Sequence, residues 1–348
     1  AMLNQGLVAY PYIETTTASV AGGILENMPR LDWASGAPSL LLEPSRTNRC
    51  TSSEYFETAA WLSIGSPTIT TNYGISPEGV QNSTRIVFSA ANECIYDGIA
   101  YTSEEVSTIY VKGTSGETIK FGKGDNIFVG TLFTLDGAWQ RLEFVQSVSG
   151  NTFTINTSGG ATARDIEVWG AQNEEASYPT SYIPTYGASQ TRLRDNARIS
   201  SAAGVIGQSA GTIFADFIPT KSFGAQLIEI ANGSTDRIFT KDQINGAFRF
   251  DINANKSQVV DYTSPTGLIT EGQSNKFAIT YSASGYALYI NGSKITSATD
   301  SVVFNSDIDA LYLAQTYSGQ NINDFKSNNV ILFPTALSDE ECIQLTTV

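Results

Sequence analysis

Short runs of alternating apolar and polar residues, separated by turn signals, fill most of this chain. In residues 141–145, Leu142 and Phe144 share one face of an extended chain, and in residues 165–169 Ile166 and Val168 share one face while the acids take the other. Asn-Gly and Asp-Gly pairs separate many of the runs, and these residues tolerate the positive φ angles of hairpin turns. Many short strands joined by tight turns predict an all-β protein built from antiparallel β-sandwiches.

The clearest hairpin and the only convincing helix signal both lie near the C-terminus. Residues 286–295 read as two strands joined by a turn at Asn291 and Gly292. Ser338 and Glu341 have the spacing of a capping box, in which each side chain bonds the backbone N–H of the other residue. We therefore expect one helix of one or two turns there and strands elsewhere.

A domain boundary is predicted near residues 177–196, where two prolines at close spacing forbid a helix and favour extended chain. With 348 residues the chain is long enough for two domains. We predict a jelly-roll-type sandwich over residues 50–186 and a second sandwich over residues 187–348. Residues 1–49 would form a leading segment that packs on the body, and its leucine run at residues 40–42 would add strands.

Composition and charge restrict the partners of the protein. Hydrophobic residues make up 41% of the chain and charged residues only 16%. This composition is typical of a globular protein and not of a disordered one. The net charge is −14 and no run of Lys or Arg could follow a phosphate backbone, so we expect no nucleic-acid binding. No apolar stretch approaches the roughly 20 residues of a membrane span, so no membrane insertion is expected. A neutral glycan, a cation or a protein partner fits better, although acidity can also serve solubility alone.

Several kinds of catalysis are excluded because the chain contains no histidine. Ser-His-Asp and Cys-His catalysis and most zinc-enzyme chemistry need one. The three cysteines, Cys50, Cys94 and Cys342, lie far apart and form no Cys-x-x-Cys pair. We interpret them as buried, inert residues, of which at least one must be a free thiol.

Three segments together resemble modules of tailed-phage tail-fibre and receptor-binding proteins. They are PRLDW (29–33) with LLEPSRTN (41–48), VWGAQNEE (168–175) with YPTSYIPT (178–185), and the stretch from residue 191 to 197 leading into GTIF (211–214). In such proteins these phrases bracket a jelly-roll carbohydrate-binding-like module and open a concanavalin A-like (laminin G-like) sandwich. Bacterial surface proteins and prophages carry the same modules.

The resemblance implies a non-catalytic protein that binds a glycan or a host-surface receptor, at a virion or an extracellular surface. Other virion proteins would be partners, and a homo-oligomer is allowed because fibre proteins are often trimeric. Two alternatives remain open. One is a polysaccharide depolymerase or lyase of the same fold, which would present an E-x-D-x-x-E strand pattern that this chain lacks, residues 165–167 coming nearest. The other is an inert structural module of a virion.

A structural Ca²⁺ is also implied by resemblance. The segment around Glu57, with the later stretch that ends at Asp165, is similar to the framework of jelly-roll carbohydrate-binding modules, where an early Glu and a late Asp often hold Ca²⁺. Glu57 and Asp165 are therefore predicted ligands, and the alternative is a surface pair without a cation. In the second domain, Asn323 and Asp324 stand where relatives tend to have two acids, which weakens a Ca²⁺ prediction there.

Sugar recognition needs aromatic faces and polar groups that fix hydroxyls. In the first domain Tyr96, Tyr101 and Phe128 lie among small polar residues and are candidates, although any one of them is more often a framework residue. The tryptophans at positions 61, 139 and 169 are interpreted as core.

In the second domain, strand alternation places three charged residues on a face opposite the core. Glu229 lies between Ile228 and Ile230, and Arg249 and Asp251 alternate with phenylalanines. The trio of Glu229, Arg249 and Asp251 could line a concave binding face. Alternatively, it forms a solvated sheet surface whose ion pairs contribute little.

Overall fold

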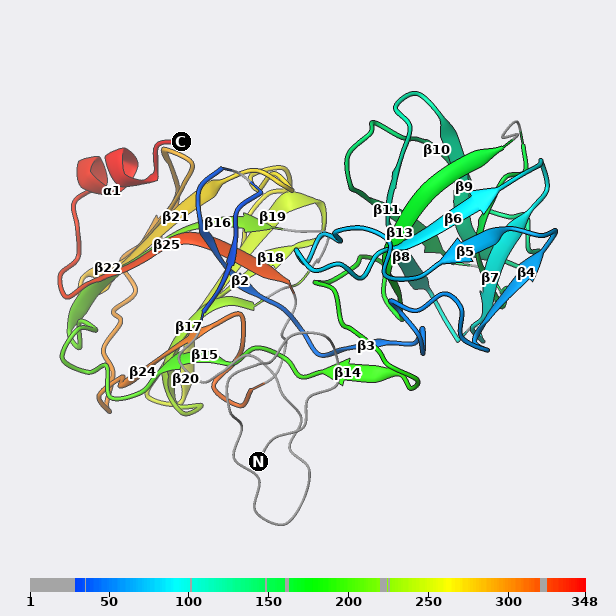
Figure 1. The fold of residues 1–348 in the computed structure, drawn as a ribbon. Helices are drawn as coiled ribbons and strands as arrows, with labels where there is room; N and C mark the ends of the chain where they lie inside the picture. Colours follow the sequence, from blue (N-terminus) through cyan, green and yellow to red (C-terminus); the bar gives the residue numbers. More distant parts are fainter. Residues whose placement is uncertain are drawn as a thin grey trace, which may run out of the picture. The chain divides into compact units, whose positions relative to one another are not determined.

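Two separate sets of antiparallel sheets make up the protein (Figure 1). The structure is a computed structural model, and it describes residues 29–34, 36–100, 102–147, 149–159, 163–219, 224, 226–319 and 324–348. Within these, the first unit comprises residues 45–193, and the second comprises residues 29–44 and 194–348.

The first unit is a jelly-roll-like sandwich of two five-stranded sheets with a two-stranded ribbon. Its strands are β3 (Arg46–Asn48), β4 (Trp61–Ile64), β5 (Thr68–Thr70), β6 (Thr84–Phe88), β7 (Cys94–Gly98), β8 (Glu105–Gly113), β9 (Thr118–Gly124), β10 (Thr131–Thr134), β11 (Gln140–Gln146), β12 (Thr152–Asn156), β13 (Arg164–Glu174) and β14 (Gln190–Arg192). The sheets have the orders β10-β9-β12-β7-β4 and β11-β8-β13-β6-β5, and β14 pairs with β3.

The core of the first unit lies between its two sheets. In β6, Ile86 and Phe88 are completely buried while the residues between them are partly exposed, which is the period-two pattern of a half-buried strand. Trp61 and Phe121 both pack edge-on against Phe153, with ring centroids 5.6 Å and 5.3 Å away. The two faces predicted at residues 141–145 and 165–169 are confirmed, since Leu142, Ile166 and Val168 lie in this core and Phe144 packs against it.

The second unit is a sandwich of a seven-stranded and a six-stranded sheet, followed by one short helix. Its elements are β1 (Arg30–Asp32), β2 (Ser39–Leu42), β15 (Ala197–Ile199), β16 (Ala210–Pro219), β17 (Gln226–Asn232), β18 (Asp236–Gln243), the 3₁₀ turn η1 (Ile244–Gly246), β19 (Ala247–Ala254), β20 (Ser257–Thr263), β21 (Asn275–Ser282), β22 (Gly285–Ile290), β23 (Ser293–Ala298), β24 (Ala310–Leu313), β25 (Phe325–Phe333) and α1 (Asp339–Thr346). One sheet has the order β1-β2-β25-β16-β21-β22-β23, and the other β15-β24-β17-β18-β19-β20. The all-β prediction is therefore confirmed.

The hairpin and the helix predicted near the C-terminus are both confirmed. The turn between β22 and β23 contains Asn291 and Gly292 at φ angles of 47° and 78°, which suit a tight hairpin. At the start of α1 the Ser338 side chain accepts from the Glu341 backbone N–H, and the Glu341 side chain accepts from the Ser338 backbone N–H. This reciprocal capping stabilises a helix too short to be stable alone.

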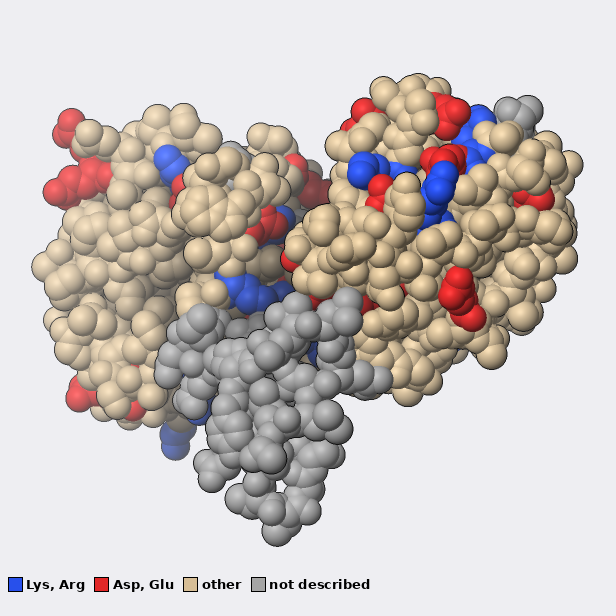
Figure 2. Space-filling model, in the orientation of Figure 1, with Lys and Arg blue, Asp and Glu red and all other residues tan. Residues whose placement is uncertain are grey.

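Charged side chains are sparse on the face drawn in Figure 2. There, acidic and basic groups stand singly or in small mixed clusters among uncharged residues. No helix in the described ranges is long and apolar enough to cross a membrane.

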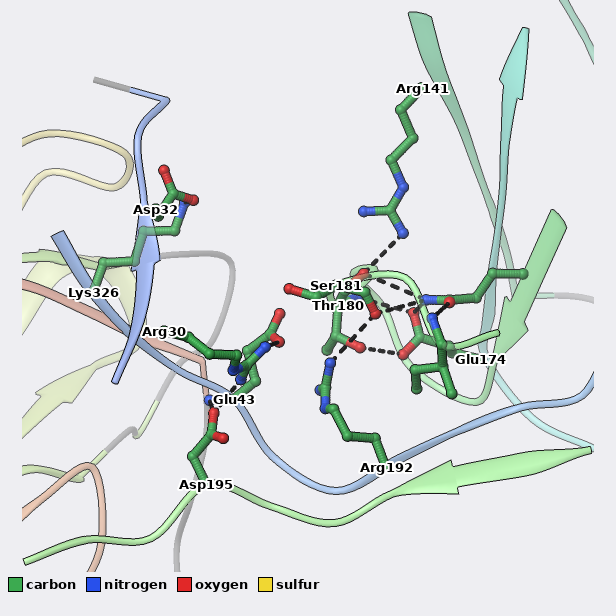
Figure 3. A network of polar contacts seen from close by, with 12 residues as sticks. Arg30, Asp32, Glu43, Arg141, Glu174, Thr180, Ser181, Arg192, Asp195 and Lys326 are labelled. Carbon is green, nitrogen blue, oxygen red and sulfur yellow. Dashed lines mark hydrogen bonds and ion pairs between the residues drawn. The ribbon is translucent and has the colours of Figure 1, made fainter. Parts of the chain in front are cut away.

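The leading segment contributes to both units. Residues 1–28 lie outside the described residues, and β1 and β2 extend the seven-stranded sheet of the second unit, with Leu40 opposite Ser327 of β25. Arg30 of β1 forms ion pairs with Glu43 and Asp195 (Figure 3). Farther along, β3 belongs to the first unit. The leucine run predicted to add strands thus forms β2.

The proline-rich stretch within the predicted boundary region is packed and not a free tether. Ile183 and Thr185 are buried in the first unit. The carbonyl of Ile183 accepts from the Asn48 side chain at 2.8 Å, and Thr185 bonds Ser53 through backbone and side chain. The change from the first unit to the second comes after Leu193.

Candidate functional site

A row of side chains crosses the whole six-stranded sheet of the second unit on the face opposite the core. Strand register places its members directly opposite one another in the order Arg198, Tyr312, Glu229, Phe239, Asp251 and Asp261. Residues adjacent in sequence, such as Ile230, Ile238 and Ile252, point the other way into the core. With strands about 4.8 Å apart, five spacings give a row roughly 24 Å long. We call this set the polar row.

Phe239 is the aromatic centre of the polar row. Its neighbours two residues away along β18 are cations on the same face. The Arg237 guanidinium lies 4.8 Å from the Phe239 ring centroid and the Lys241 ammonium 5.6 Å from it. Arg237 also lies 5.8 Å from the Tyr317 ring. Cations are attracted to the negative face of an aromatic ring, so Arg237 and Lys241 help to hold the Phe239 ring in place.

Glu229 is a completely buried carboxyl group within the polar row. Its Oε2 accepts from the backbone N–H of Tyr317 at 3.2 Å, and its Oε1 lies 3.7 Å from the Arg237 guanidinium. Loss of hydration raises its pKa to about 7, although Arg237 and the Tyr317 N–H favour the charged form. This carboxyl group therefore changes its charge near neutral pH.

Asp251 is the second buried carboxyl group of the row, and it is held by several donors. Arg249 donates to both of its oxygens, at 2.9 Å and 3.0 Å, and Gln258 donates to Oδ1 at 3.1 Å. The same guanidinium lies 3.0 Å from the exposed Asp261 carboxylate. Burial raises the pKa of Asp251, and Arg249 opposes that shift.

The trio predicted from alternation therefore does share one face, but it is not a solvated surface. Glu229 and Asp251 are fully buried, and Arg249 is about one-third exposed. Arg249 and Gln258 bond Asp251, while Tyr317 and Arg237 lie against Glu229. The alternation of β18 could have revealed Arg237 and Phe239, which the sequence interpretation left out.

The aromatic candidates of the first unit lie near a loop that covers one sheet. Tyr96 of β7 lies opposite Thr154 of β12, whose hydroxyl donates to the Ile127 carbonyl at 2.7 Å. The Phe128 carbonyl accepts from Ser158 at 3.2 Å, so its loop is tied to the chain that follows β12. Tyr96 and Phe128 are both half-buried, and Tyr101 lies outside the described residues.

The two predicted Ca²⁺ ligands are not brought together. Glu57 is exposed in the turn before β4, and Asp165 lies in β13 of the other sheet. Both Asp165 oxygens accept from Arg85, at 2.8 Å and 2.6 Å, so they are already occupied by a cationic side chain. In the described part of the chain no group of three or more Asp, Glu, Cys or His side chains could hold a metal ion. These residues do not fit a shared Ca²⁺.

The three cysteines are buried and unpaired. Burial raises the pKa of the Cys50 thiol well above its ordinary value, and the nearby Asp97 adds to that shift. The interpretation of these residues as inert thiols agrees with their burial, because a thiol kept neutral is a poor nucleophile.

An aromatic group of the first unit could not be recognised from the sequence. Trp169, interpreted as core, is indeed buried at 4% exposed, but it also lines a pocket of about 310 Å³ together with Tyr110 and Tyr182. Trp169 directly follows Val168, which is buried in the core, and so it faces the opposite side of β13.

Comparison with known proteins identifies the second unit. Residues 194–342 match the family model described as the concanavalin A-like lectin/glucanases superfamily. The second unit is a concanavalin A-like, laminin G-like domain. The family match covers this domain and leaves the first unit unassigned. No curated protein matches the chain significantly.

Solved structures with a similar fold include binding modules and sialidases. The carbohydrate-binding module CBM40 of the Ruminococcus gnavus IT-sialidase, solved with α2,3-sialyllactose, is 19% identical, with 44% of this chain and 97% of that chain covered and a TM-score of 0.38. A heptameric pentraxin of Limulus polyphemus is 14% identical, with 41% and 73% covered and a TM-score of 0.34. The NanB sialidase of Streptococcus pneumoniae is 20% identical, with 42% and 26% covered and a TM-score of 0.36. These likenesses concern the fold alone.

Proposed function

We propose that this protein binds glycans without cleaving them, and that the polar row of its concanavalin A-like domain is the binding face. The observation that carries the proposal is Phe239, a half-buried ring at the centre of a row of fixed polar groups. Sugars are bound by aromatic faces that contact their C–H surfaces and by polar groups that bond their hydroxyls.

Two arginines beside the polar row are held in place before any ligand arrives. Arg249 is fixed between Asp251 and Asp261, and Arg237 is fixed between Glu229 and the Phe239 ring. Side chains that are already ordered lose little conformational entropy when a ligand binds. A row of roughly 24 Å suits a chain of several sugar residues better than a single ring.

A depolymerase or lyase is the second candidate, and the raised pKa of Glu229 is the observation that favours it. A carboxyl group with a pKa of about 7 can act as a general acid near neutral pH. Two features argue for binding instead. Glu229 is completely buried. Asp251 is the acid of the polar row nearest to Glu229, and its oxygens already accept hydrogen bonds from Arg249 and Gln258. A catalytic pair must reach the scissile bond from both sides.

The biological setting that we propose is adhesion of a tailed phage to its host. The sequence phrases at residues 29–48, 168–185 and 191–214 support this setting, because they resemble those of tail-fibre and receptor-binding proteins. The ligand would then be a glycan or another receptor of the host surface, and other virion proteins would anchor the chain. Tail genes beside this gene would support the setting, and a gene neighbourhood without any would count against it.

The experiment is a glycan array probed with the full chain, paired with a reducing-end assay on every glycan that binds. Binding without release of reducing ends is the expected result. Release of new reducing ends, abolished by Glu229→Gln, would show a depolymerase instead. No binding to any glycan would favour the inert structural module.

A further inference from the structure

The first unit has two adjoining pockets that the polar row does not involve. The smaller, of about 310 Å³, is lined by Pro77, Glu78, Tyr110, Trp169, Tyr182 and Pro184. The larger, of about 720 Å³, has Tyr55 and Tyr186 in its wall, with ring centroids 6.3 Å apart. The hydroxyls of Tyr182 and Tyr186 both donate to Oε1 of Glu54, at 3.0 Å and 3.2 Å, so one carboxyl group joins the walls of the two pockets.

Strand register places two rings of the smaller pocket, Tyr110 and Trp169, next to each other. Arg141 of β11, Tyr110 of β8 and Trp169 of β13 lie opposite one another across the outer face of their sheet. The centroid of Trp169 is 5.4 Å from that of Tyr110 and 4.4 Å from that of Tyr182. Arg141 stacks at 5.6 Å on the Tyr110 ring and donates to the Thr180 carbonyl at 2.8 Å (Figure 3). Arg141 thus holds the Tyr110 ring of the pocket wall in place.

Gly170 makes this close approach of the rings possible. It lies at a φ angle of 64°, where the register of β13 shifts. A Cβ atom there would lie 3.2 Å from Tyr110 and 3.3 Å from Tyr182, tighter than ordinary van der Waals contact. Glycine is favoured at such an angle, and here it also leaves space for two tyrosine rings.

The smaller pocket also has an acceptor without full partners. Trp169 is only 4% exposed and its Nε1 is buried, so its ring forms part of the pocket wall. Glu78 is exposed, and only its Oε2 accepts a bond within the described chain, a long one of 3.4 Å from Asn82.

We propose that the two pockets bind consecutive rings of an uncharged hexopyranose chain, one ring in the pocket lined by Tyr110 and Trp169 and the next against Tyr55 and Tyr186. Aromatic walls and a carboxylate acceptor are groups that bind the C–H faces and the hydroxyls of a pyranose ring. No described residue lining either pocket is Lys or Arg, while Glu78 lines one and Glu54 lies between them. An acidic sugar would be repelled there, because the described lining holds a carboxyl group and no lysine or arginine, and the nearby Arg141 is engaged by the Tyr110 ring and the Thr180 carbonyl.

The test is titration of the full chain, followed by tryptophan fluorescence, with four neutral trisaccharides and one acidic one. The neutral probes are cellotriose, maltotriose, mannotriose and N-acetylated chitotriose, and the acidic probe is trigalacturonic acid. At least one neutral probe is expected to saturate the fluorescence change, and trigalacturonic acid to give none. Saturation by the acidic probe alone, or by no probe, would overturn the proposal.

Variants assign the binding to these pockets. Tyr110→Ala removes an aromatic wall, and Glu78→Gln weakens the acceptor on an exposed side chain that the fold does not need. Each should weaken binding of the neutral probe by about tenfold. The control Glu104→Gln makes the same chemical change at an exposed position outside both pockets and should leave binding unchanged. Unchanged affinity of the Glu78→Gln protein for the neutral probe would contradict binding in these pockets. A loss of affinity in Phe239→Ala alone would also contradict it, and would leave the proposal for the polar row standing.

Discussion

Lys123 of β9 forms an ion pair with Glu105 of β8, and both side chains are completely buried within the first unit. The other Glu105 oxygen accepts from Arg49. Burial lowers the pKa of Lys123, and Glu105 opposes that shift. Two charges removed from water depend on each other, because either one alone would be left uncompensated.

Loss of one partner of this pair should therefore destabilise the first unit strongly. Lys123→Met is expected to lower the free energy of unfolding by about 3–5 kcal/mol, since it leaves Glu105 buried with Arg49 alone. Chemical denaturation of the full chain measures the change. Lys120→Met, on the same strand but partly exposed, is the matched control and should cost less than about 1 kcal/mol. Equal effects of the two substitutions would contradict the assignment.

The pKa of Glu229 predicts a pH dependence with a definite sign. The folded-state pKa is raised from 4.5 to about 7, so the folded chain holds this proton more tightly than the unfolded chain does. The stabilisation is fully present below pH 4.5 and is lost as the pH rises through about 7. Relative to Glu229→Gln, the wild-type protein should lose roughly 3 kcal/mol of stability between these limits.

Denaturation of both proteins at several pH values checks this prediction. The comparison with Glu229→Gln is needed because burial also raises the pKa of Asp97, to about 6, and that group shifts the stability of both proteins alike. A difference between the two proteins that does not change with pH would mean that Glu229 titrates as an ordinary exposed carboxyl group.

Asp165 should matter little for stability, with or without calcium. Its ion pair with Arg85 is about half exposed, and exposed pairs contribute about 0–1 kcal/mol. We expect Asp165→Ala to lower the melting temperature only slightly, and EDTA to leave the wild-type melting temperature unchanged. A drop in melting temperature on adding EDTA that Asp165→Ala abolishes would instead support the calcium site implied by the sequence resemblance.

The second unit should depend on the segment of residues 29–44. In β2, Leu40 lies opposite Ser327 of β25, and Leu42 is buried in the core. A fragment of residues 194–348 would expose the β25 edge and leave a gap in that core. A synthetic peptide of residues 29–44 should raise its melting temperature, and the same peptide with Leu42→Asp should not. A fragment that is equally stable with and without the peptide would contradict this dependence.

The strands and the single helix followed from local patterns in the sequence. The alternation around Ile166 and the capping box of Ser338 and Glu341 each depend on residues close together in the chain, so both could be predicted. Alternation also placed Glu229 and Asp251 on one face, opposite the core. What lies beside a residue on its own strand is visible in the sequence.

The burial of those two carboxyl groups could not be predicted. Arg249 lies beside Asp251 on its own strand, but Gln258, Arg237 and Tyr317 reach the two carboxyl groups through cross-strand register and a long connection. The aromatic pocket was missed for the same reason. Tyr110 and Trp169 lie far apart in the sequence and meet only because β8 pairs with β13.

The most direct test of the account is the affinity of the full chain for the glycan that binds best on the array, measured for the wild type, Phe239→Ala and Trp33→Ala. Trp33 is the matched control, an exposed aromatic residue of the second unit that lies outside the polar row. The account predicts that Phe239→Ala weakens binding by about tenfold or more, while Trp33→Ala leaves it within about twofold of the wild type. Wild-type affinity in a correctly folded Phe239→Ala protein would contradict the claim that the polar row binds the glycan.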